Sequence, residues 1–243
     1  MRVVGIIQAR MGSTRLPGKV LSDLGGQTAL ARVIRRVRRA RALDDVIVAT
    51  SESAADLAIV DQCRRLSTAC FRGSEDDVLD RYYCAAKEVE ATAVVRITAD
   101  CPLIAPEIIE ETAAAFLNEQ PDYASNALVP GYPRGLDVEV FTMEALSRTW
   151  QHARLPYERV HVTPYMYEVP GRFRVLSVAA KADYSHYRWT LDTSEDLSMI
   201  RTVYEHFGSN DLFGWRDVLA LMQQEPQLAE INMHVRQKAV HEG

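Results

Sequence analysis

The chain has 243 residues, of which 47% are apolar and 25% are charged, so it can bury a sizeable core. This composition excludes a disordered or fibrous protein. The 28 basic and 33 acidic side chains give a net charge of −5, which argues against a general nucleic-acid binder or a membrane-surface protein. The first apolar run, Val3–Ile7, is too short for a signal-peptide core or a membrane span, so we expect a cytoplasmic protein.

Three short apolar runs rich in β-branched residues predict strands that are buried on both faces, at Val3–Ile7, Val46–Ala49 and Ala93–Ile97. Stretches with helical periodicity lie between and after them. The expected helices cover Leu30–Val37, Ala54–Leu66, Asp76–Glu88 and Pro106–Leu117. This alternation indicates β-α-β units, so we predict a doubly wound α/β fold with a mostly parallel sheet, in a single domain of residues 1–243.

The first of these helices carries a run of arginines, which we interpret as a solvated helix face rather than a phosphate or nucleic-acid contact. The run consists of Arg32, Arg35, Arg36, Arg38 and Arg39. The four cysteines have spacings that fit neither a zinc site nor a redox motif, so we expect buried free thiols. They are Cys63, Cys70, Cys84 and Cys101.

The pattern changes after Pro121, where a loop rich in Pro and Gly covers Asn126–Gly135. Later strands are expected at Leu136–Phe141, Arg172–Val178 and Tyr187–Leu191, and later helices at Thr142–His152, Thr193–Phe207 and Phe213–Gln224. Aromatic and Met side chains, which are enriched in interface cores, concentrate in residues 121–190, where they could form an interface. These side chains are Tyr157, Tyr165, Met166, Tyr167 and Tyr187, with packing inside the domain as the alternative.

The strongest local signal is the segment Gln8–Lys19, directly after the first strand, where open α/β sheets bind ligands. Arg10, Arg15 and Lys19 bring three cations into ten residues, and Gly12 and Ser13 allow close approach and hydrogen bonding. Such a loop suits a polyphosphate. Its spacing fits neither a Walker loop nor a dinucleotide fingerprint, and the alternative is a surface loop whose arginines pair with carboxylates.

Residues 7–21 resemble the signature of the cytidylyltransferase family that includes acylneuraminate and 3-deoxy-manno-octulosonate cytidylyltransferases. The resemblance is greatest to the branch typified by the spore coat polysaccharide biosynthesis protein SpsF. Further matching segments follow in order, and the likeness covers roughly the first 205 residues. They are residues 71–82, 96–103, 134–139, 161–165 and 190–197.

The resemblance implies a Rossmann-like fold of the nucleotide-diphospho-sugar transferase type with a small C-terminal excursion. It also implies transfer of CMP from CTP to a sugar acid or related small acceptor, with release of pyrophosphate. By the same resemblance we expect residues 121–190 to bind the acceptor and to form a homodimer interface. We expect Arg15, Lys19 and Asp100 to be catalytic, because in-line displacement at phosphorus needs charge neutralisation. The expected nucleotide-binding residues are Gln8, Ala9, Arg10, Gly12, Ser13, Lys19, Arg72, Asp80 and Arg81.

Asp100 and Asp192 each follow a predicted strand, and hard carboxylate oxygens of this kind are what Mg²⁺ prefers. By resemblance they match the family's metal-binding aspartates. The alternatives are a turn residue for Asp100 and a helix cap for Asp192. Five further residues are expected to bind the acceptor, although Val160 stands where this branch has an acidic residue. They are Arg134, Asp137, Glu139, His161 and Tyr165.

Two other functions stay open at this point. A metal-dependent glycosyltransferase would use the same type of fold with an Asp-x-Asp pair, but the residues after Asp100 are Cys101 and Pro102. A non-catalytic nucleotide-binding protein would keep the basic loop but would have less need of two metal carboxylates.

Overall fold

The structure is a computed structural model, and it describes residues 1–237. Within this range one sheet has the strand order β3-β2-β1-β4-β6-β5-β7. The strands are β1 (Val3–Gln8), β2 (Asp45–Ser51), β3 (Ala69–Gly73), β4 (Ala93–Thr98), β5 (Tyr123–Ser125), β6 (Glu139–Thr142) and β7 (Val175–Ser177). β6 runs antiparallel to both of its neighbours, whereas the other pairs are parallel. The predicted mostly parallel, doubly wound sheet is therefore confirmed.

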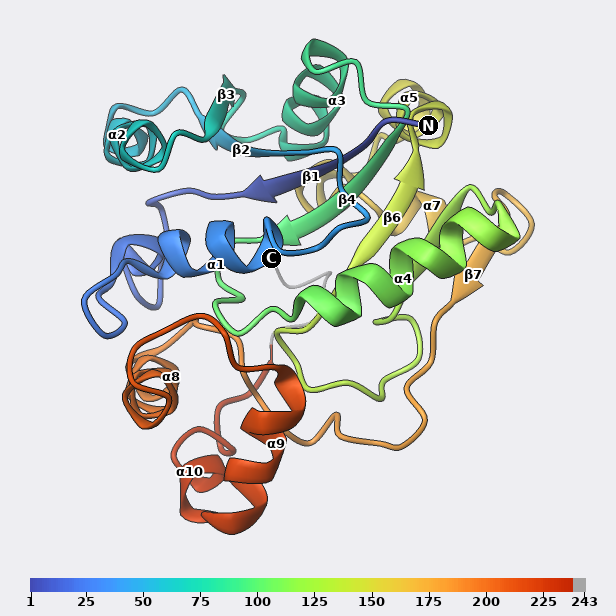
Figure 1. Ribbon diagram of the computed structural model, residues 1–243. Coiled ribbons are helices and arrows are strands. Elements are labelled where there is room, and N and C mark those ends of the chain that lie inside the picture. The colour runs from blue at the N-terminus through green and yellow to red at the C-terminus, as the bar shows by residue number, and fades with distance from the viewer. Residues whose placement is uncertain (238–243) are drawn as a thin grey trace.

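Helices cover both faces of this sheet, and Figure 1 shows α1 and α4 crossing its front face. The first core cluster joins that face to α1 (Ala29–Val37), α2 (Leu57–Arg65), α4 (Pro106–Glu119), α8 (Ser194–His206) and α9 (Trp215–Gln224). The second cluster joins the opposite face to α3 (Val78–Glu88), α5 (Met143–His152) and α7 (Pro164–Tyr167), and α6 (Pro156–His161) lies against α3. Three short helices complete the described chain: η1 (Lys19–Leu21), η2 (Ala54–Asp56) and α10 (Gln227–Glu230).

The continuous apolar run in β1 is explained by these two layers. Val3 and Ile7 face the first cluster, whereas Val4 and Ile6 face the second, and all four side chains are buried. Successive side chains of a strand alternate between faces, so only a strand covered on both sides requires apolar residues at every position.

Two strands were not predicted. β3 lies at the sheet edge with half-exposed residues, and β5 has only three residues, so neither forms an apolar run. The strand predicted at Tyr187–Leu191 is wrong. This segment is extended between Arg134 and Asp100, and its amides donate to their carbonyls, but it makes only an isolated bridge between Arg134 and Arg188.

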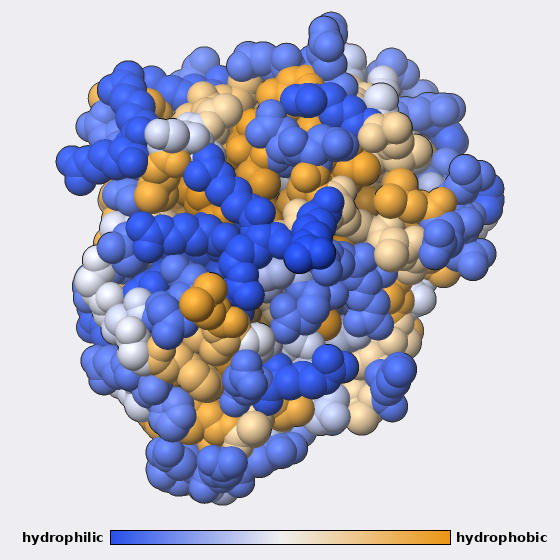
Figure 2. Space-filling model, viewed as in Figure 1, coloured by the Kyte–Doolittle hydropathy of each residue, from blue (hydrophilic) through white to orange (hydrophobic). Residues whose placement is uncertain are grey.

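The prediction that all arginines of α1 are solvated is also wrong. Arg32 and Arg36 are fully buried and donate to backbone carbonyls of Leu24, Ile104 and Phe213. Arg35, Arg38 and Arg39 are exposed, and Figure 2 shows a hydrophilic band across the middle of this face, where α1 lies in Figure 1.

The expected free thiols are present, although only Cys63 and Cys101 are buried and Cys70 and Cys84 are partly exposed. Among residues 1–237, no helix is both long enough and apolar enough to cross a membrane.

Candidate active site

A cavity of about 640 Å³ opens at the carboxyl ends of β1 and β4. β1 has β2 on one side and β4 on the other, so this is the switch point where open α/β sheets bind ligands. Eleven of the residues predicted from the sequence line this cavity: Gln8, Arg10, Gly12, Ser13, Arg15, Lys19, Asp100, Arg134, Asp137, His161 and Asp192.

The loop that follows β1 is held in shape by its own backbone and by Asp56. The Met11 amide donates to Asp56 Oδ1 at 2.7 Å, and the Met11 carbonyl accepts from the amides of Ser13 and Gly18. Burial alone would raise the pKa of Asp56, but hydrogen bonds from Ser51, Met11 and Thr50 hold it below its ordinary value. The anchored loop leaves open space at Gly12, where an added Cβ would meet no atom within 4 Å.

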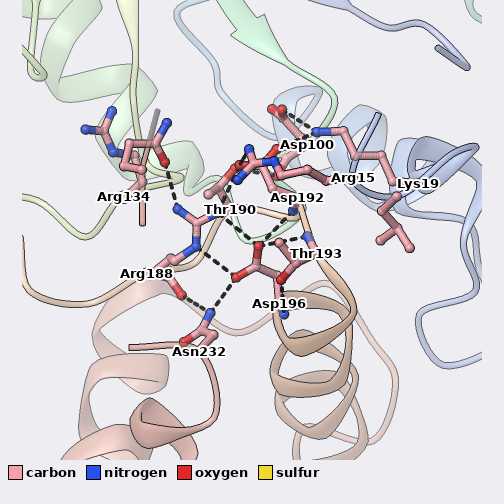
Figure 3. Close-up of polar contacts among 12 residues, drawn as sticks. Arg15, Lys19, Asp100, Arg134, Arg188, Thr190, Asp192, Thr193, Asp196 and Asn232 are labelled. Carbon is pink, nitrogen blue, oxygen red and sulfur yellow. Dashed lines mark hydrogen bonds and ion pairs between the residues drawn. The ribbon is translucent and has the colours of Figure 1, made fainter. Parts of the chain in front are cut away.

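Lys19 joins the loop to both predicted metal-binding carboxylates (Figure 3). Gly18 takes a left-handed conformation, with φ of 71°, and η1 then begins at Lys19. Lys19 Nζ lies 2.8 Å from Asp100 Oδ2 and 2.7 Å from Asp192 Oδ1. Burial alone would lower the pKa of Lys19, but the two carboxylates raise it above its ordinary value. Burial alone would raise the pKa of Asp100, and Lys19 instead holds it below its ordinary value.

Asp192 binds two further cations. Its Oδ2 lies 3.0 Å from Arg15 Nη2 and 2.9 Å from Arg188 Nη2. Arg15 and Lys19 therefore pair with carboxylates, as in the alternative interpretation of the loop, and at the same time line the cavity. Asp192 does not cap the helix that follows, because the N-cap of α8 is Thr193.

The two carboxylates fit a divalent cation. Asp100 and Asp192 converge on one ammonium group, which shows that both can face a single positive charge. Within residues 1–237 there is no cluster of three or more His, Cys, Asp and Glu side chains that could hold a metal ion. A hard cation here would therefore need phosphate oxygens and water as its remaining ligands, which is how Mg²⁺ is usually held.

The opposite wall of the cavity carries Arg134 and Asp137, which lie 3.4 Å apart between Arg134 Nη1 and Asp137 Oδ2. Burial, together with the charges of Glu139 and Asp100, raises the pKa of Asp137. Gly135 has a φ of 107°, and a Cβ there would lie 2.6 Å from the carbonyl carbon of Trp189. Only glycine allows this close approach, which brings the Arg134–Asp137 wall beside the segment that carries Asp192.

Glu139, predicted to bind the acceptor, does not line the cavity. It is buried, pairs with Arg96, and accepts hydrogen bonds from Tyr123 and Thr163. Arg96 in turn donates to Gln8 Oε1 at 3.2 Å. Glu139 is therefore linked to the cavity only through Arg96 and Gln8, and its role in acceptor binding stays a prediction.

His161 and Tyr165, both predicted to bind the acceptor, lie on different helices, because α6 ends at His161 and α7 begins at Pro164. Between them Val162 has φ 73° and ψ −53°, and the Thr163 amide donates to the His161 carbonyl. This γ-turn is strained for a β-branched residue. It leaves His161 at the cavity, whereas the ring of Tyr165 stacks under the Arg172 guanidinium at 3.8 Å.

Four of the predicted nucleotide-binding residues do not line the cavity. The amide of Ala9 donates to Ala49, Arg72 donates to the carbonyls of Ser51 and Ser53, and Asp80 accepts from the Trp150 indole. Arg81 is buried and donates to the Ser74 carbonyl, while burial lowers its pKa. A nucleotide role for these four stays a prediction.

Several residues of the site were missed in the sequence. Arg188, Asp196 and Asn232 form a buried group behind Asp192, and Asp56 anchors the loop. A signal existed for Asp196, since Thr193 and Asp196 form a capping box at the start of α8. None existed for Asn232, which meets Arg188 only through the tertiary fold.

Comparisons with known proteins show the family of this chain. The cytidylyltransferase family model matches residues 4–216. An uncharacterized protein of Methanocaldococcus jannaschii is 40% identical over all of this chain and 99% of its own length. The spore coat polysaccharide biosynthesis protein SpsF of Bacillus subtilis is 32% identical over 93% of this chain and 96% of its own. The structure of a cytidylyltransferase from Leptospira borgpetersenii, 32% identical, superposes with a TM-score of 0.91 over 98% of this chain and 100% of its own. The chain belongs to the cytidylyltransferase family.

Proposed function

We propose that the protein transfers CMP from CTP to an oxygen of a sugar acid or related small acceptor, with release of pyrophosphate and with Mg²⁺ as cofactor. One observation carries this proposal: in a chain of the cytidylyltransferase family, the cations of the loop after β1 and the carboxylates of Asp100 and Asp192 meet in one cavity.

The loop supplies the charge that this reaction needs. The acceptor oxygen forms a bond to the α-phosphorus as the bond to the bridging oxygen breaks, so negative charge moves onto the leaving pyrophosphate. Arg10, Arg15 and Lys19 line the cavity and neutralise that charge. Asp100 and Asp192 would hold Mg²⁺, which when bound would supply further charge neutralisation at the phosphates.

The opposite wall suits the acceptor. Arg134 presents a guanidinium that can bind a carboxylate or phosphate, and Asp137 presents an oxygen that accepts a hydrogen bond from a hydroxyl group. His161 also lines the cavity. A small molecule that carries both an anionic group and hydroxyl groups fits this set, and sugar acids have both.

The proposal is tested by titrating the protein with each of the four nucleoside triphosphates and Mg²⁺ in a calorimeter, and by measuring pyrophosphate release with a panel of sugar acids. Arg15→Ala and Lys19→Ala should each lower turnover by at least about 100-fold, because each removes a charge that neutralises the leaving group. Arg64→Ala is the matched control, because Arg64 is exposed on α2 and pairs only with Asp61 among the ion pairs of residues 1–237. Near-normal pyrophosphate release by both loop variants would overturn the proposal.

The other functions give different results in the same assays. A glycosyltransferase would release a nucleoside diphosphate from a nucleotide sugar. The family to which the chain belongs gives no support to this alternative. A non-catalytic protein would bind CTP without releasing pyrophosphate with any acceptor.

We also propose that residues 121–190 bind the acceptor and form a homodimer, and that the enzyme works in the cytoplasm, where CTP is made. Exposed apolar side chains in this part of the chain support an interface, namely Leu155, Val169 and Val175, of which the last lies on edge strand β7. Met166 is fully buried and so contributes to the core instead. Light scattering that gives only a 27.3 kDa particle with full activity would remove this part of the proposal.

A further inference from the structure

The C-terminal segment, residues 227–237, reaches the cavity although the family match ends at residue 216. The segment begins with α10, where Leu228 packs into the first core cluster and is 6% exposed. Asn232 is 1% exposed, and Gln237 lines the cavity beside the residues of the proposed acceptor wall. The segment is therefore packed against the site rather than attached to it loosely.

Asn232 uses its side-chain amide to hold two acceptors together. Asn232 Nδ2 donates to the Arg188 carbonyl at 2.9 Å and to Asp196 Oδ1 at 2.8 Å. Both acceptors belong to buried residues, so a side chain without these two hydrogens would leave them unsatisfied. The amide thus fixes Arg188 relative to the first turn of α8.

Arg188 and Asp196 transmit this position to Asp192 (Figure 3). The Arg188 guanidinium forms a bidentate pair with Asp196 at 2.9 and 3.0 Å, and its Nη2 also donates to Asp192 Oδ2 at 2.9 Å. Asp196 Oδ2 accepts from the amides of Asp192 and Thr193. Gln237 Oε1 accepts from Arg188 Nη1 at 2.7 Å. Both the backbone and the carboxylate of Asp192 are held by this one group.

We propose that the C-terminal segment is a working part of the active site, in which Asn232 and Gln237 are positioning residues that orient the Asp192 carboxylate through Arg188. The inference rests on the proposed function, because the orientation of Asp192 matters through Mg²⁺ and CTP. Asn232 and Gln237 lie beyond residues 4–216, the part of the chain that the family model matches.

The test measures CTP binding by calorimetry, once with Mg²⁺ and once with EDTA. Asn232→Leu keeps the size of the side chain and removes both donors. We expect the Mg²⁺-dependent gain in CTP affinity to fall by about 10-fold or more, as for other residues that orient a metal ligand, while the affinity in EDTA is unchanged because the loop cations remain. Gln237→Leu, at an exposed position, should lose a smaller part of the gain.

Two variants in the same segment separate positioning from stability. Leu228→Ala opens a cavity in the core and lowers the melting temperature without touching the polar group, and Met233→Ala changes an exposed side chain. Both should keep the Mg²⁺-dependent gain. The inference would be overturned, with the proposed function left standing, by either of two results. One is that Asn232→Leu and Gln237→Leu keep the parent's Mg²⁺-dependent gain in CTP affinity, and the other is that Leu228→Ala loses as much of this gain as Asn232→Leu does. A parent protein that binds no CTP would overturn the proposed function and this inference with it.

Discussion

Replacement of Lys19 by methionine tests whether its ammonium group holds the two carboxylates of the site together. Methionine is unbranched and of similar length, so it keeps the packing of the chain and removes only the charge. The substitution removes the ion pairs that Nζ forms with Asp100 at 2.8 Å and with Asp192 at 2.7 Å. The variant leaves Asp100 and Asp192 facing one another without the cation between them.

The expected loss in the free energy of unfolding follows from the burial of these charged groups. Removing one partner of a buried ion pair costs about 3–5 kcal/mol. The cost here is lower, because Asp192 keeps Arg15 and Arg188, and the Asp100 side chain is 28% exposed and so partly screened by solvent. We expect about 2 kcal/mol, which for a chain of this size lowers the melting temperature by about 4–8 °C.

The loss must depend on pH. Lys19 holds the pKa of Asp100 below its ordinary value of 3.8, so this contact stabilises the fold at pH above 3.8, and the contribution is lost as the pH falls through the folded-state pKa. In urea unfolding, the free energy of unfolding of the parent should therefore exceed that of the variant by a larger amount at pH 7 than at pH 3. Lys87→Met, on the exposed face of α3, is the control. Equal stability of Lys19→Met and parent at pH 7, or the same difference at both pH values, would refute the reasoning.

Three further predictions concern the carboxylates and their partners. Asp100→Asn and Asp192→Asn should lose turnover far more than melting temperature, and a variant whose CTP binding responds to Mg²⁺ as the parent's does would show that its residue is structural. Thr163→Val should cost about 1–3 kcal/mol in urea unfolding because Glu139 loses a donor, whereas Thr163→Ser keeps the hydroxyl; equal losses would contradict this role. Asp137 has a raised pKa, so its contribution to stability is lost as the pH rises through that pKa; Asp137→Asn should raise the melting temperature at pH 7 but not at pH 3, and a lower value at pH 7 would contradict this.

The sequence predicts the elements whose residues carry a local signal. β1, β2 and β4 are buried on both faces, so each contains a mostly apolar run that stands out from the amphipathic helices around it. The cation-rich loop follows β1 and therefore lies at the carboxyl edge of the sheet, where the structure places it. The approach of Lys19 to Asp100 follows from the same geometry, because β1 and β4 are adjacent and parallel.

The remaining features depend on contacts between distant segments. Arg32 and Arg36 belong to a run of arginines for which the sequence predicts a solvated helix face. Only the fold shows that backbone carbonyls and aromatic rings surround these two side chains. The strand predicted at Leu136–Phe141 begins only at Glu139, as β6, so the two-residue period does not extend back to Asp137. The buried partner of Arg188, Asn232, lies 44 residues further along a segment without a clear pattern.

Phosphorus NMR of the protein incubated with CTP, Mg²⁺ and a panel of sugar acids would follow the proposed transfer of CMP itself. The proposed CMP transfer requires that CTP is consumed only when a suitable acceptor is present, and that equal amounts of pyrophosphate and of a CMP diester are formed. CTP that stays intact with every acceptor, or release of a nucleoside diphosphate from a nucleotide sugar in place of pyrophosphate, would contradict it.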